Sequence, residues 1–565
     1  MLEFDVIVVG AGGAGMMAAL KAGEGNDLKI AVLSKVLPTR SATGCAQGGM
    51  NAALGNKDAT DTIELHFKDT VKGSGFLADQ DAVEFFVSKM PDVMAELDYM
   101  GVPYNRDENG KIAQRPFGGA SKPRACYSAD KIGHVVLHAL YEQCLKNGVN
   151  FLNEWQLLSM AVEDGKFHGL VAMDLKSGEI HPMNCKSIVM ATGGFGRVYY
   201  SRTTNPTGST GDGTAIAFDA GIPIKDPEFV QFHPTGLAHT GILLSEACRG
   251  DGGYLLNNQG ERFMAKYDPD KMELGTRDVV ARSIELEIKN GFGFGEGMSS
   301  HVLMDVRHLG KEHIMTRLPG ARDTALTFEG IDIINDPVPI RPACHYSMGG
   351  IHVTDYQTCA TTMDGVHAAG ESCSVSVHGA NRLGANSVSE VVFFGKYAGL
   401  GARDTAMKRS FGNAKLIQKE AEKWKSEFKR VRHKKDGTNM FEIRNRMGAT
   451  MWNNLGIYRN GEDMETALSD INQLLEDYKD AFVGDEALAY NKAFINYLEL
   501  GNSLKLAKAI ALGAINRKES RGSHSRADYQ KRDDKEFLKH TLIYKDDENY
   551  KVDYCPVAIT TYQPE

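Results

Sequence analysis

The sequence has no apolar stretch long enough to cross a bilayer, no CxxC cysteine pair and no excess of basic residues. Its longest apolar runs have the length of strands, whereas a membrane helix needs about 20 apolar residues, and no signal peptide or twin-arginine leader is evident. The formal net charge of −9 argues against a dedicated nucleic-acid-binding protein, which needs concentrated Lys and Arg. We therefore expect a cytoplasmic protein whose partners are proteins and small molecules, with no nucleic acid among them.

The nine cysteines are scattered along the chain and form no cluster motif. Both the spacing of ferredoxin-type ligands and the CxxCH sequence that attaches haem are missing. The sequence therefore predicts no iron–sulfur cluster, no haem and no metal site in this chain, and thiols that stay reduced. With 565 residues, 42% of them hydrophobic, the chain can bury a large core and should divide into two to four domains.

A glycine-rich turn lies near the start of the chain, between the apolar run 6–9 and the helix-prone segment 16–20. In this GAGGAG turn, Gly10 permits a tight bend, Gly12 lets the backbone approach a pyrophosphate, and Gly15 lets the helix pack on the strand. A second apolar strand at 30–33 completes the spacing of a βαβ unit and favours a dinucleotide site. The next residues are Ser34 and Lys35, where NAD-binding proteins usually have an acid, so NAD fits poorly.

The rest of the chain changes composition several times. A helix is expected over 81–100, a buried strand at 188–190 leads into a sharp turn, and a similar piece lies at 365–371. Between them, residues 228–335 are rich in polar turns, His and Arg, which suggests an inserted domain over the cofactor. Residues 410–520 have helical apolar spacing, and the stretch after 522 is polar with little periodicity, so we expect it to wrap a surface.

These shifts predict an α/β fold. A Rossmann-like dinucleotide-binding domain is expected from residues 1–228 and 335–405, with an α+β capping domain inserted at 229–334. A helical bundle should follow at 410–520, and a tail subdomain at 521–565. No internal repeat or low-complexity linker is evident.

A polar segment at 378–387 leads directly into an apolar helical run at 388–401. Ser387 or Asn386 is expected to cap that helix. A helix N-terminus directed at a flavin ring would stabilise the negative charge that develops on reduction. The alternative is a capped helix with a purely structural role, although the segment also carries an Arg and a His that structure alone would not require.

Polar side chains of the types that bind a small dianion occur in four separated segments. Arg pairs with carboxylates through two hydrogen bonds, and His and Ser add directional donors. Taken singly, each of these His residues is more often structural than functional, so the prediction depends on their convergence. The segments are 231–235, 244–253, 276–282 and 344–350.

Together these features resemble the flavoprotein subunits of succinate dehydrogenase and fumarate reductase, essentially from end to end. The resemblance implies FAD, a fumarate or succinate site between the FAD domain and the capping domain, and a partner iron–sulfur subunit. It also implies a membrane-anchor or quinone-linked subunit reached through that partner, and so a peripheral position at the cytoplasmic membrane. The motifs that carry it are GAGGAG at 10–15, Gln47-Gly48-Gly49, Ala191-Thr192-Gly193-Gly194, Gln231-Phe232-His233-Pro234-Thr235, His345-Tyr346-Ser347-Met348-Gly349-Gly350, Asn381-Arg382-Leu383-Gly384 and the segment 519–529.

The resemblance assigns substrate-binding roles by position. Arg382 and His345 are expected to hold one carboxylate, and His233 and Ser245 the other. Family members commonly have Thr where Ser245 stands, which keeps the hydroxyl. Phe117 resembles the ring that packs on the substrate, and Gly49 is expected beside it.

The same resemblance makes Arg277 the proton donor, supplied through Glu246 and Arg249. Physically, hydride goes to one alkene carbon of fumarate and a proton must reach the neighbouring carbon. An Arg is an unusual acid, since its reference pKa is about 12.5 or above, so it can serve only as a relay that is rapidly reprotonated. The alternative for Arg277 is an ordinary salt bridge with Asp278.

The cofactor site implied by the resemblance departs from the family at one position. The family typically attaches FAD covalently through the His of an Arg-Ser-His-Thr segment, whereas this chain has Ala42 there, after Arg40 and Ser41. The closest His in sequence is His66, so we predict non-covalent FAD, a lower flavin potential and a bias towards fumarate reduction. The residues expected at FAD are Gly10, Gly12, Gly13, Ala14, Gly15, Ser34, Lys35, Ser41, Ala42, Thr43, Gln47, Gly48, Gly49, Ala191, Thr192, Gly193, Asp212, Glu371, Arg382, Ala385 and Ser387.

Several alternatives stay open at this point. A misaligned loop could leave another residue to make the covalent bond, a laboratory substitution could have produced Ala42, and Cys45 could be an attachment point, although nothing nearby activates its thiol. L-aspartate oxidase, which holds FAD without a covalent link, is the nearest enzymatic rival. Soluble single-chain fumarate reductases and a non-catalytic flavin scaffold that docks partner subunits are the others.

Overall fold

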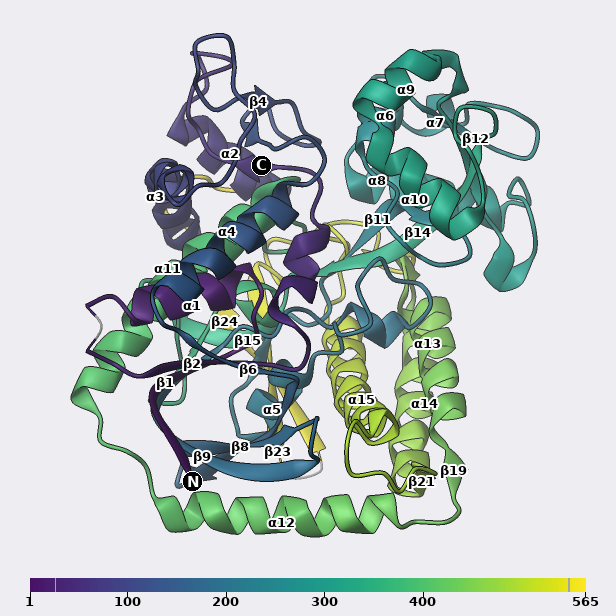
Figure 1. Ribbon diagram of the computed structural model, residues 1–565. Helices are drawn as coiled ribbons and strands as arrows, with labels where there is room; N and C mark the ends of the chain where they lie inside the picture. The colour runs from purple at the N-terminus through teal and green to yellow at the C-terminus, as the bar shows by residue number, and fades with distance from the viewer. Residues whose placement is uncertain (26, 547–548, 565) are drawn as a thin grey trace.

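The computed structural model describes residues 1–25, 27–546 and 549–564 and is built on one large mixed sheet (Figure 1). The centre of this sheet is parallel and runs in the order β6-β2-β1-β9-β17. Strands β1 and β2 are apolar and buried along most of their length, and α1 (Gly13–Ala22) and α11 (Asn386–Lys408) pack against this centre. This is the Rossmann-like α/β arrangement that the sequence predicts. The strands are β1 (Leu2–Val9), β2 (Ile30–Ser34), β6 (Asn150–Asn153), β9 (Glu179–Met190) and β17 (Val366–Ala368).

Further strands extend the sheet beyond this parallel centre, and most of them pair antiparallel with their neighbours. A hairpin of β7 and β8 pairs with β9, while β16, β15, β10 and β23 continue the sheet on the other side to β24. The added strands are β7 (Trp155–Glu163), β8 (Lys166–Asp174), β10 (Ile224–Lys225), β15 (Gly350–Asp355), β16 (Ala360–Thr361), β18 (Cys373–Ser374), β23 (Lys539–Asp546) and β24 (Asn549–Pro556).

The expectation that the last segment wraps a surface is wrong. Strands β23 and β24 form a hairpin whose inner strand pairs with β10, so the end of the chain is part of the main sheet. His540 and Thr541 are fully buried there. Their polar side chains hide the strand pattern from the sequence, because buried strands are usually apolar and these two are satisfied instead by hydrogen bonds to buried carboxylates.

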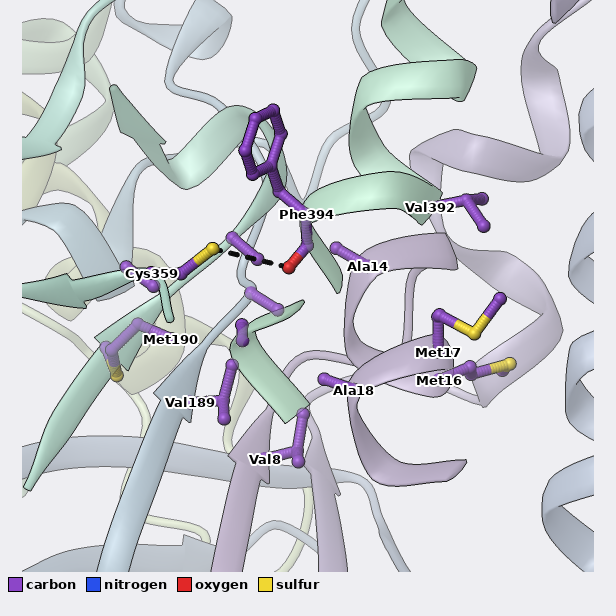
Figure 2. Packing of buried hydrophobic residues seen from close by; sticks show 14 of the residues in the cluster. Val8, Ala14, Met16, Met17, Ala18, Val189, Met190, Cys359, Val392 and Phe394 are labelled. Carbon is purple, nitrogen blue, oxygen red and sulfur yellow. Dashed lines mark hydrogen bonds between the residues drawn. The ribbon is translucent and has the colours of Figure 1, made fainter. Parts of the chain in front are cut away.

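Helix α1 (Gly13–Ala22) crosses α11 (Asn386–Lys408) over the parallel centre, and apolar side chains from both fill the space above the strands (Figure 2). The backbones approach closely because α11 has glycine at the crossing. A Cβ on Gly395 would lie 2.6 Å from the Ala14 carbonyl oxygen, and one on Gly399 would lie 2.3 Å from that of Ala18. This contact places the start of α1 beside Val391 and Gly395 of α11, so that α11 extends beyond it towards the loop that precedes Asn386.

The predicted cap of α11 is wrong. The helix begins at Asn386 itself, and the residue before it, Ala385, has a left-handed φ of 62° with no side-chain cap. The Asn386 side chain contacts Asn51, His66 and Thr70 instead. The Asn386 amide therefore joins α11 to Asn51 and to helix α2 (Ile63–Gly73), and no side chain of the described residues caps the first backbone N–H groups of α11.

A second, four-stranded antiparallel sheet has the order β11-β14-β13-β12 and its own hydrophobic core (Figure 1). Short helices cover it. The predicted capping domain, residues 229–334, ends before β14. Because β14 pairs with both β11 and β13, we propose that this domain extends through Ser347. The elements are β11 (Val230–Leu237), β12 (Tyr254–Leu256), β13 (Val302–Asp305), β14 (Val338–Ser347), α6 (Ala247–Gly250), α7 (Met264–Tyr267), α8 (Arg277–Lys289), α9 (Lys311–Arg317) and α10 (Pro319–Glu329).

The helical region after α11 contains α13, α14 and α15, which pack around a shared core, and α12, which lies along strands β7 to β9 (Figure 1). In the part of the chain that the structure describes, no helix is both long enough and apolar enough for a membrane span. The remaining helices are α2 (Ile63–Gly73), α3 (Gln80–Tyr99), which confirms the helix expected at 81–100, α4 (Ile132–Lys146), α5 (Asp212–Asp219), α12 (Ala414–Arg432), α13 (Met440–Leu455), α14 (Gly461–Lys479) and α15 (Lys492–Asn516).

The buried His540 ties the C-terminal hairpin to the rest of the sheet. Its Nδ1 lies 2.6 Å from Asp226 Oδ2 and its Nε2 lies 3.1 Å from Asp79 Oδ1. Burial and Lys225 oppose its protonation, but the two carboxylates outweigh them and raise its pKa above the usual value. The imidazolium therefore stabilises the fold below a pH of about 6.5, the unfolded value, and this stabilisation is lost as the pH rises through the higher folded pKa.

We expect His540→Gln to lower the free energy of unfolding by about 3 kcal/mol at pH 6, as for other broken buried ion pairs, with a smaller difference at pH 9. Thermal unfolding followed by circular dichroism at both pH values measures this. His433→Gln, at a surface-exposed histidine, is the control. An equal loss at both pH values would contradict a charged His540.

Candidate functional site

A cavity of about 1060 Å³ begins at the glycine-rich turn and reaches the capping sheet. Gly10 has a φ of +108°, and a Cβ there would lie 2.1 Å from the Ala191 carbonyl oxygen, so only glycine fits where β1 meets the turn after β9. Gly15 does not line the cavity. A Cβ on it would lie 1.8 Å from the Gly10 carbonyl oxygen, which makes it the packing glycine of the turn. The wall thus forms where two parallel strands end, the usual place for a ligand in such sheets.

The polar atoms of this wall fit a large polar cofactor. Ser41 Oγ, Gln47 Oε1 and Thr192 Oγ1 are buried and have no protein partner. Buried polar atoms in folded proteins are almost always satisfied, so unpartnered ones around one cavity indicate a ligand. The expected FAD-contacting residues that line the cavity are Gly10, Gly12, Gly13, Ala14, Ser34, Lys35, Ser41, Ala42, Thr43, Gln47, Gly48, Gly49, Ala191, Thr192, Gly193, Asp212, Glu371, Arg382, Ala385 and Ser387.

One end of the cavity carries a cluster of charges around Lys35. Its Nζ lies 2.7 Å from Asp212 Oδ2, 2.8 Å from Glu499 Oε1 and 2.9 Å from Thr210 Oγ1. Although partial burial of Lys35 opposes its charge, these carboxylates raise its pKa. Carboxylates therefore do lie at the end of β2, where NAD-binding proteins usually have an acid, but they are Asp212 of α5 and Glu499 of α15. Glu499 was not predicted, because nothing local in α15 distinguishes it from other acidic residues of helices.

Glu371 is a second buried acid on the cavity wall. Its Oε1 accepts a hydrogen bond from the Ser347 backbone N–H at 2.9 Å. Burial raises its pKa to about 8, so the carboxyl group is largely protonated at neutral pH and can donate a hydrogen bond into the cavity.

The loop that holds Ala42 lines the same cavity. Of the described residues that line it, only His345 is a histidine, and its ring is already engaged with Thr204. His66 lies elsewhere, with Nε2 3.0 Å from Asn386 Oδ1. Cys45 lines the cavity and is exposed there. Partial desolvation by the surrounding wall still raises the pKa of its thiol, so the thiolate that would attack a flavin is disfavoured.

At the end of the cavity opposite Lys35, three side chains form a largely buried chain of charges. They come from helices α6 and α8, which cover the capping sheet, and from the residue before α6. Arg277 donates two hydrogen bonds to Glu246 Oε2, at 2.7 and 3.0 Å, and Arg249 Nη2 lies 3.0 Å from Glu246 Oε1. Burial opposes ionisation of Glu246, but the two guanidinium groups lower its pKa well below the usual value. The predicted alternative, a salt bridge between Arg277 and Asp278, is wrong, since Asp278 pairs with Arg282.

Two imidazoles lie beside this chain of charges. The rings of His233 and His345 are 5.0 Å apart between centroids. Burial lowers the pKa of His233 to about 3 and that of His345 well below its usual value, so both are neutral at physiological pH. The Thr235 backbone N–H donates to His233 Nδ1 at 3.2 Å, which leaves the His233 Nε2–H as a donor on the Glu246 side.

Arg382 completes the group from the loop before α11. Its guanidinium stacks 4.4 Å above the Tyr346 ring, and its buried Nε has no protein partner. Burial lowers its pKa to about 10, so it remains charged. Phe117 faces Arg277, with the ring centroid 6.0 Å from the guanidinium carbon. Arg382 Nη2 donates to Gln231 Oε1 at 2.9 Å, so the stacked guanidinium keeps an Nε–H that no described residue accepts, and such a group suits a carboxylate.

The structure therefore brings most of the predicted substrate residues together. Arg277, His345, Arg382, Phe117 and Gly49 line the cavity itself. Others reach it only through a neighbour, since Glu246 contacts Arg277 directly and holds both Arg249 and His233. Ser245 is buried next to Glu246 and accepts a hydrogen bond from the Ala247 N–H at 3.3 Å. Among the described residues, no cluster of three or more His, Cys, Asp or Glu is placed to hold a metal.

Comparisons with known proteins agree with this architecture. Residues 5–388 match the family model described as an FAD binding domain, and residues 444–565 match the one described as the fumarate reductase flavoprotein C-terminus. The chain is 48% identical over 545 residues to the 8-methylmenaquinol:fumarate reductase flavoprotein subunit of Wolinella succinogenes, covering 96% of this chain and 88% of that one.

Two further relatives extend over the whole chain. The succinate dehydrogenase flavoprotein subunit of Rickettsia bellii is 43% identical, with 100% of this chain and 96% of the relative covered. Among solved structures, a variant of the FrdA chain of E. coli quinol fumarate reductase superimposes with a TM-score of 0.96 at 38% identity, covering 100% of this chain and 99% of that chain.

Proposed function

The chain belongs to the family of flavoprotein subunits of fumarate reductases and succinate dehydrogenases, which are oxidoreductases with an FAD-binding domain, and from this membership we propose that it interconverts fumarate and succinate. The observation that carries the proposal is the cavity itself. It begins at the dinucleotide turn and ends at Arg277, His345 and Arg382, a set of donors that matches a dicarboxylate.

When bound, FAD supplies hydride transfer and two-electron storage. The protein side of the reaction then has two tasks. Arg382 and His345, which line the cavity, hold one carboxylate of fumarate. The family resemblance assigns the other carboxylate to His233 and Ser245, which are buried beside Glu246. Polarisation of the carboxylates stabilises the negative charge that develops when hydride reaches one alkene carbon.

The second task is delivery of a proton to the other alkene carbon, which completes succinate. Arg277 is the proton donor, and Glu246, hydrogen-bonded to it, returns a proton to the guanidinium from the Arg249 side. Because a neutral guanidine is very basic, reprotonation is fast. The strongly ionised Glu246 keeps Arg277 oriented and charged between turnovers.

We also propose that the FAD is held without a covalent bond, since Ala42 takes the place of the attaching histidine and His345 is engaged at the substrate end. An alkyl–imidazole link withdraws electrons and raises the flavin potential. Its absence favours electron flow from flavin to fumarate. Potentiometry that placed the bound flavin above the fumarate/succinate couple would contradict this direction.

The attachment is tested by denaturation. We expect acid precipitation of the holoprotein to release all of its FAD into the supernatant, where its absorbance equals that of the original protein-bound flavin. The denatured band should show no flavin fluorescence on a gel. As a control, Cys45→Ser should release the same amount. Flavin that stays with the wild-type pellet and is lost in Cys45→Ser would identify a thioether instead.

The family resemblance suggests that the electrons come from other subunits. We propose an iron–sulfur subunit as the direct partner and, through it, a membrane-anchor or quinone-linked subunit, so that this chain is peripheral at the cytoplasmic membrane. The relatives' names include a quinol fumarate reductase and an 8-methylmenaquinol:fumarate reductase, which supports a quinone-linked chain.

The activity can be tested without those partners. Anaerobic holoprotein mixed with reduced viologen and fumarate should oxidise the dye rapidly. No oxidation by a protein that demonstrably contains FAD would contradict the proposal, and aspartate-dependent reduction of the flavin would then point to an aspartate oxidase.

A further inference from the structure

Gln231, on β11, is a buried amide with every polar contact occupied; its side chain lies at the centre of the substrate group and is only 1% exposed. Its Oε1 accepts from Arg382 Nη2 at 2.9 Å and from Arg277 Nη1 at 3.2 Å. Its Nε2 donates to Asn381 Oδ1 at 2.7 Å and to the Arg382 carbonyl oxygen at 2.9 Å. One neutral side chain therefore contacts both arginines that the proposed reaction uses.

These contacts fix which way the amide points. A flipped Gln231 would turn its NH₂ group towards two guanidinium groups, which can only donate, and its oxygen towards two acceptors. All four hydrogen bonds would be lost at a site without solvent, where each unsatisfied polar group is costly. The carbonyl oxygen is thus held towards Arg277 and Arg382.

We propose that Gln231 is a positioning and specificity-determining residue that holds Arg277, itself paired with Glu246, beside Arg382 and adds no further negative charge to the place that the substrate dianion enters. This inference rests on the proposed function. Two guanidinium groups directed at one small volume repel each other, so they need a shared acceptor. An amide oxygen provides one without a negative charge, whereas a carboxylate would also occupy the cationic site that the substrate must enter.

Gln231 also joins two parts of the chain at the substrate. It and Arg277 belong to the capping sheet and its helix α8, while Arg382 and Asn381 precede α11. The four hydrogen bonds therefore set the distance between the donor that protonates the substrate and the donor that holds a carboxylate. Gln231 was predicted only as part of a motif and without a role of its own, because a glutamine has no charge and no reactive group.

The test compares Gln231→Glu with Gln231→Met in flavin-loaded protein. For Q231E at pH 7.5 we expect the KM for fumarate in the viologen assay to rise about tenfold or more, with a smaller change in kcat, and the binding of malonate, followed by flavin absorbance, to weaken equally. For Q231M, which keeps the volume but removes the acceptor, we expect kcat to fall about tenfold because Arg277 is no longer aligned. Hydrogen bonds to charged groups have effects of this size.

The contrast between the two variants separates charge from a merely structural defect. The charged and titratable groups around position 231 are Arg277 of α8, Arg382 before α11, His345 and Tyr346 of β14, Glu246 before α6, His233 of β11 itself and Glu371, which acts on Arg382. Arg277 and Arg382 would hold the pKa of a carboxyl group at this position low, as two guanidinium groups do for Glu246. Q231E should therefore stay ionised, with a raised KM and a smaller change in kcat, whereas the neutral Q231M should lower kcat with a smaller change in KM. Burial raises the pKa of Glu371 to about 8, so all variants are compared at the same pH of 7.5.

Gln114→Glu is the matched control, since Gln114 is another buried amide, on β4 (Gln114–Arg115), whose contacts lie outside the substrate group. Q114E should keep the KM and kcat of the wild type. A wild-type KM in Q231E, or the same fall in kcat with an unchanged KM in both Gln231 variants, would overturn the inference. If Q231E does not retain FAD, Q231M decides, and unchanged fumarate kinetics in it would overturn the inference as well. Failure of the proposed function is distinct, because the wild type itself would then neither bind malonate nor oxidise viologen.

Discussion

Arg277→Ala is expected to slow the oxidation of reduced viologen by fumarate about 100- to 10,000-fold, the range that a positioned acid contributes, while FAD stays bound. The guanidinium lies at the end of the cavity and is the only member of the Arg277–Glu246–Arg249 chain, in the described structure, that lines it. Its removal takes away both the proton donor and a positive charge beside the carboxylates. Steady-state rates with saturating fumarate measure the effect.

Two variants of the same helix sharpen this test. Arg277→Lys keeps a positive charge but cannot make both hydrogen bonds to Glu246, so we expect it to remain at least tenfold slower than wild type. Arg282→Ala, five residues further along α8, removes the pair with Asp278 and a long hydrogen bond to the Gly522 carbonyl oxygen, neither of which touches the cavity, and should leave the rate nearly unchanged. A rate in Arg277→Ala within threefold of wild type would exclude Arg277 as the donor.

Gly10→Ala is expected to weaken FAD binding by about 100-fold or more, equivalent to about 3 kcal/mol at 1.4 kcal/mol per tenfold change. The added Cβ would lie 2.1 Å from the Ala191 carbonyl oxygen, so the turn after β1 and the turn after β9 must separate. Both turns line the cavity. Titration of the apoprotein with FAD, followed by quenching of flavin fluorescence, gives the affinity.

The matched control is Gly148→Ala. Gly148 also has a positive φ, of +68°, but a Cβ there would meet nothing within 4 Å. It therefore carries the backbone strain of a non-glycine residue without the collision, and its FAD affinity should be that of the wild type. Equal losses in the two variants would mean that backbone strain and global instability, rather than the closeness of the two turns, explain the Gly10 result.

The sequence predicted the parts of the fold that have a strong local signal. The glycine-rich turn, the buried strand that ends at Met190 and the helix α3 are all read from neighbouring residues, and the structure confirms them. Strands β6 to β8 were missed, because only a few of their residues form a clear apolar run. The hairpin β23–β24 was misjudged because buried polar residues such as His540 interrupt the pattern.

The same is true of the site: residue types with a local signal were predicted, and the contacts between them were not. The types of residue needed for a dianion were visible in separate segments, and a family resemblance supplied their roles. Pairing was not visible, because Arg277 contacts Glu246, 31 residues away, rather than the adjacent Asp278. Glu499 and Gln231 were not predicted, since their importance arises only when α15 reaches Lys35 and when β11 comes to lie beside Arg382. Contacts of this kind depend on tertiary packing, which no local pattern encodes.

The pairing of β10 with β23 has a consequence for how the protein is made. Ile224 lies opposite Ile543, so two strands that touch are synthesised more than 300 residues apart. Closing so long a loop is slow compared with forming local contacts, and the ribosome must release the last strand before the sheet can close. Glu499, beside the cofactor cavity, also appears late in translation. Loading of the flavin should therefore be a step that follows synthesis, and a chain truncated before β23 should accumulate in an unloaded form.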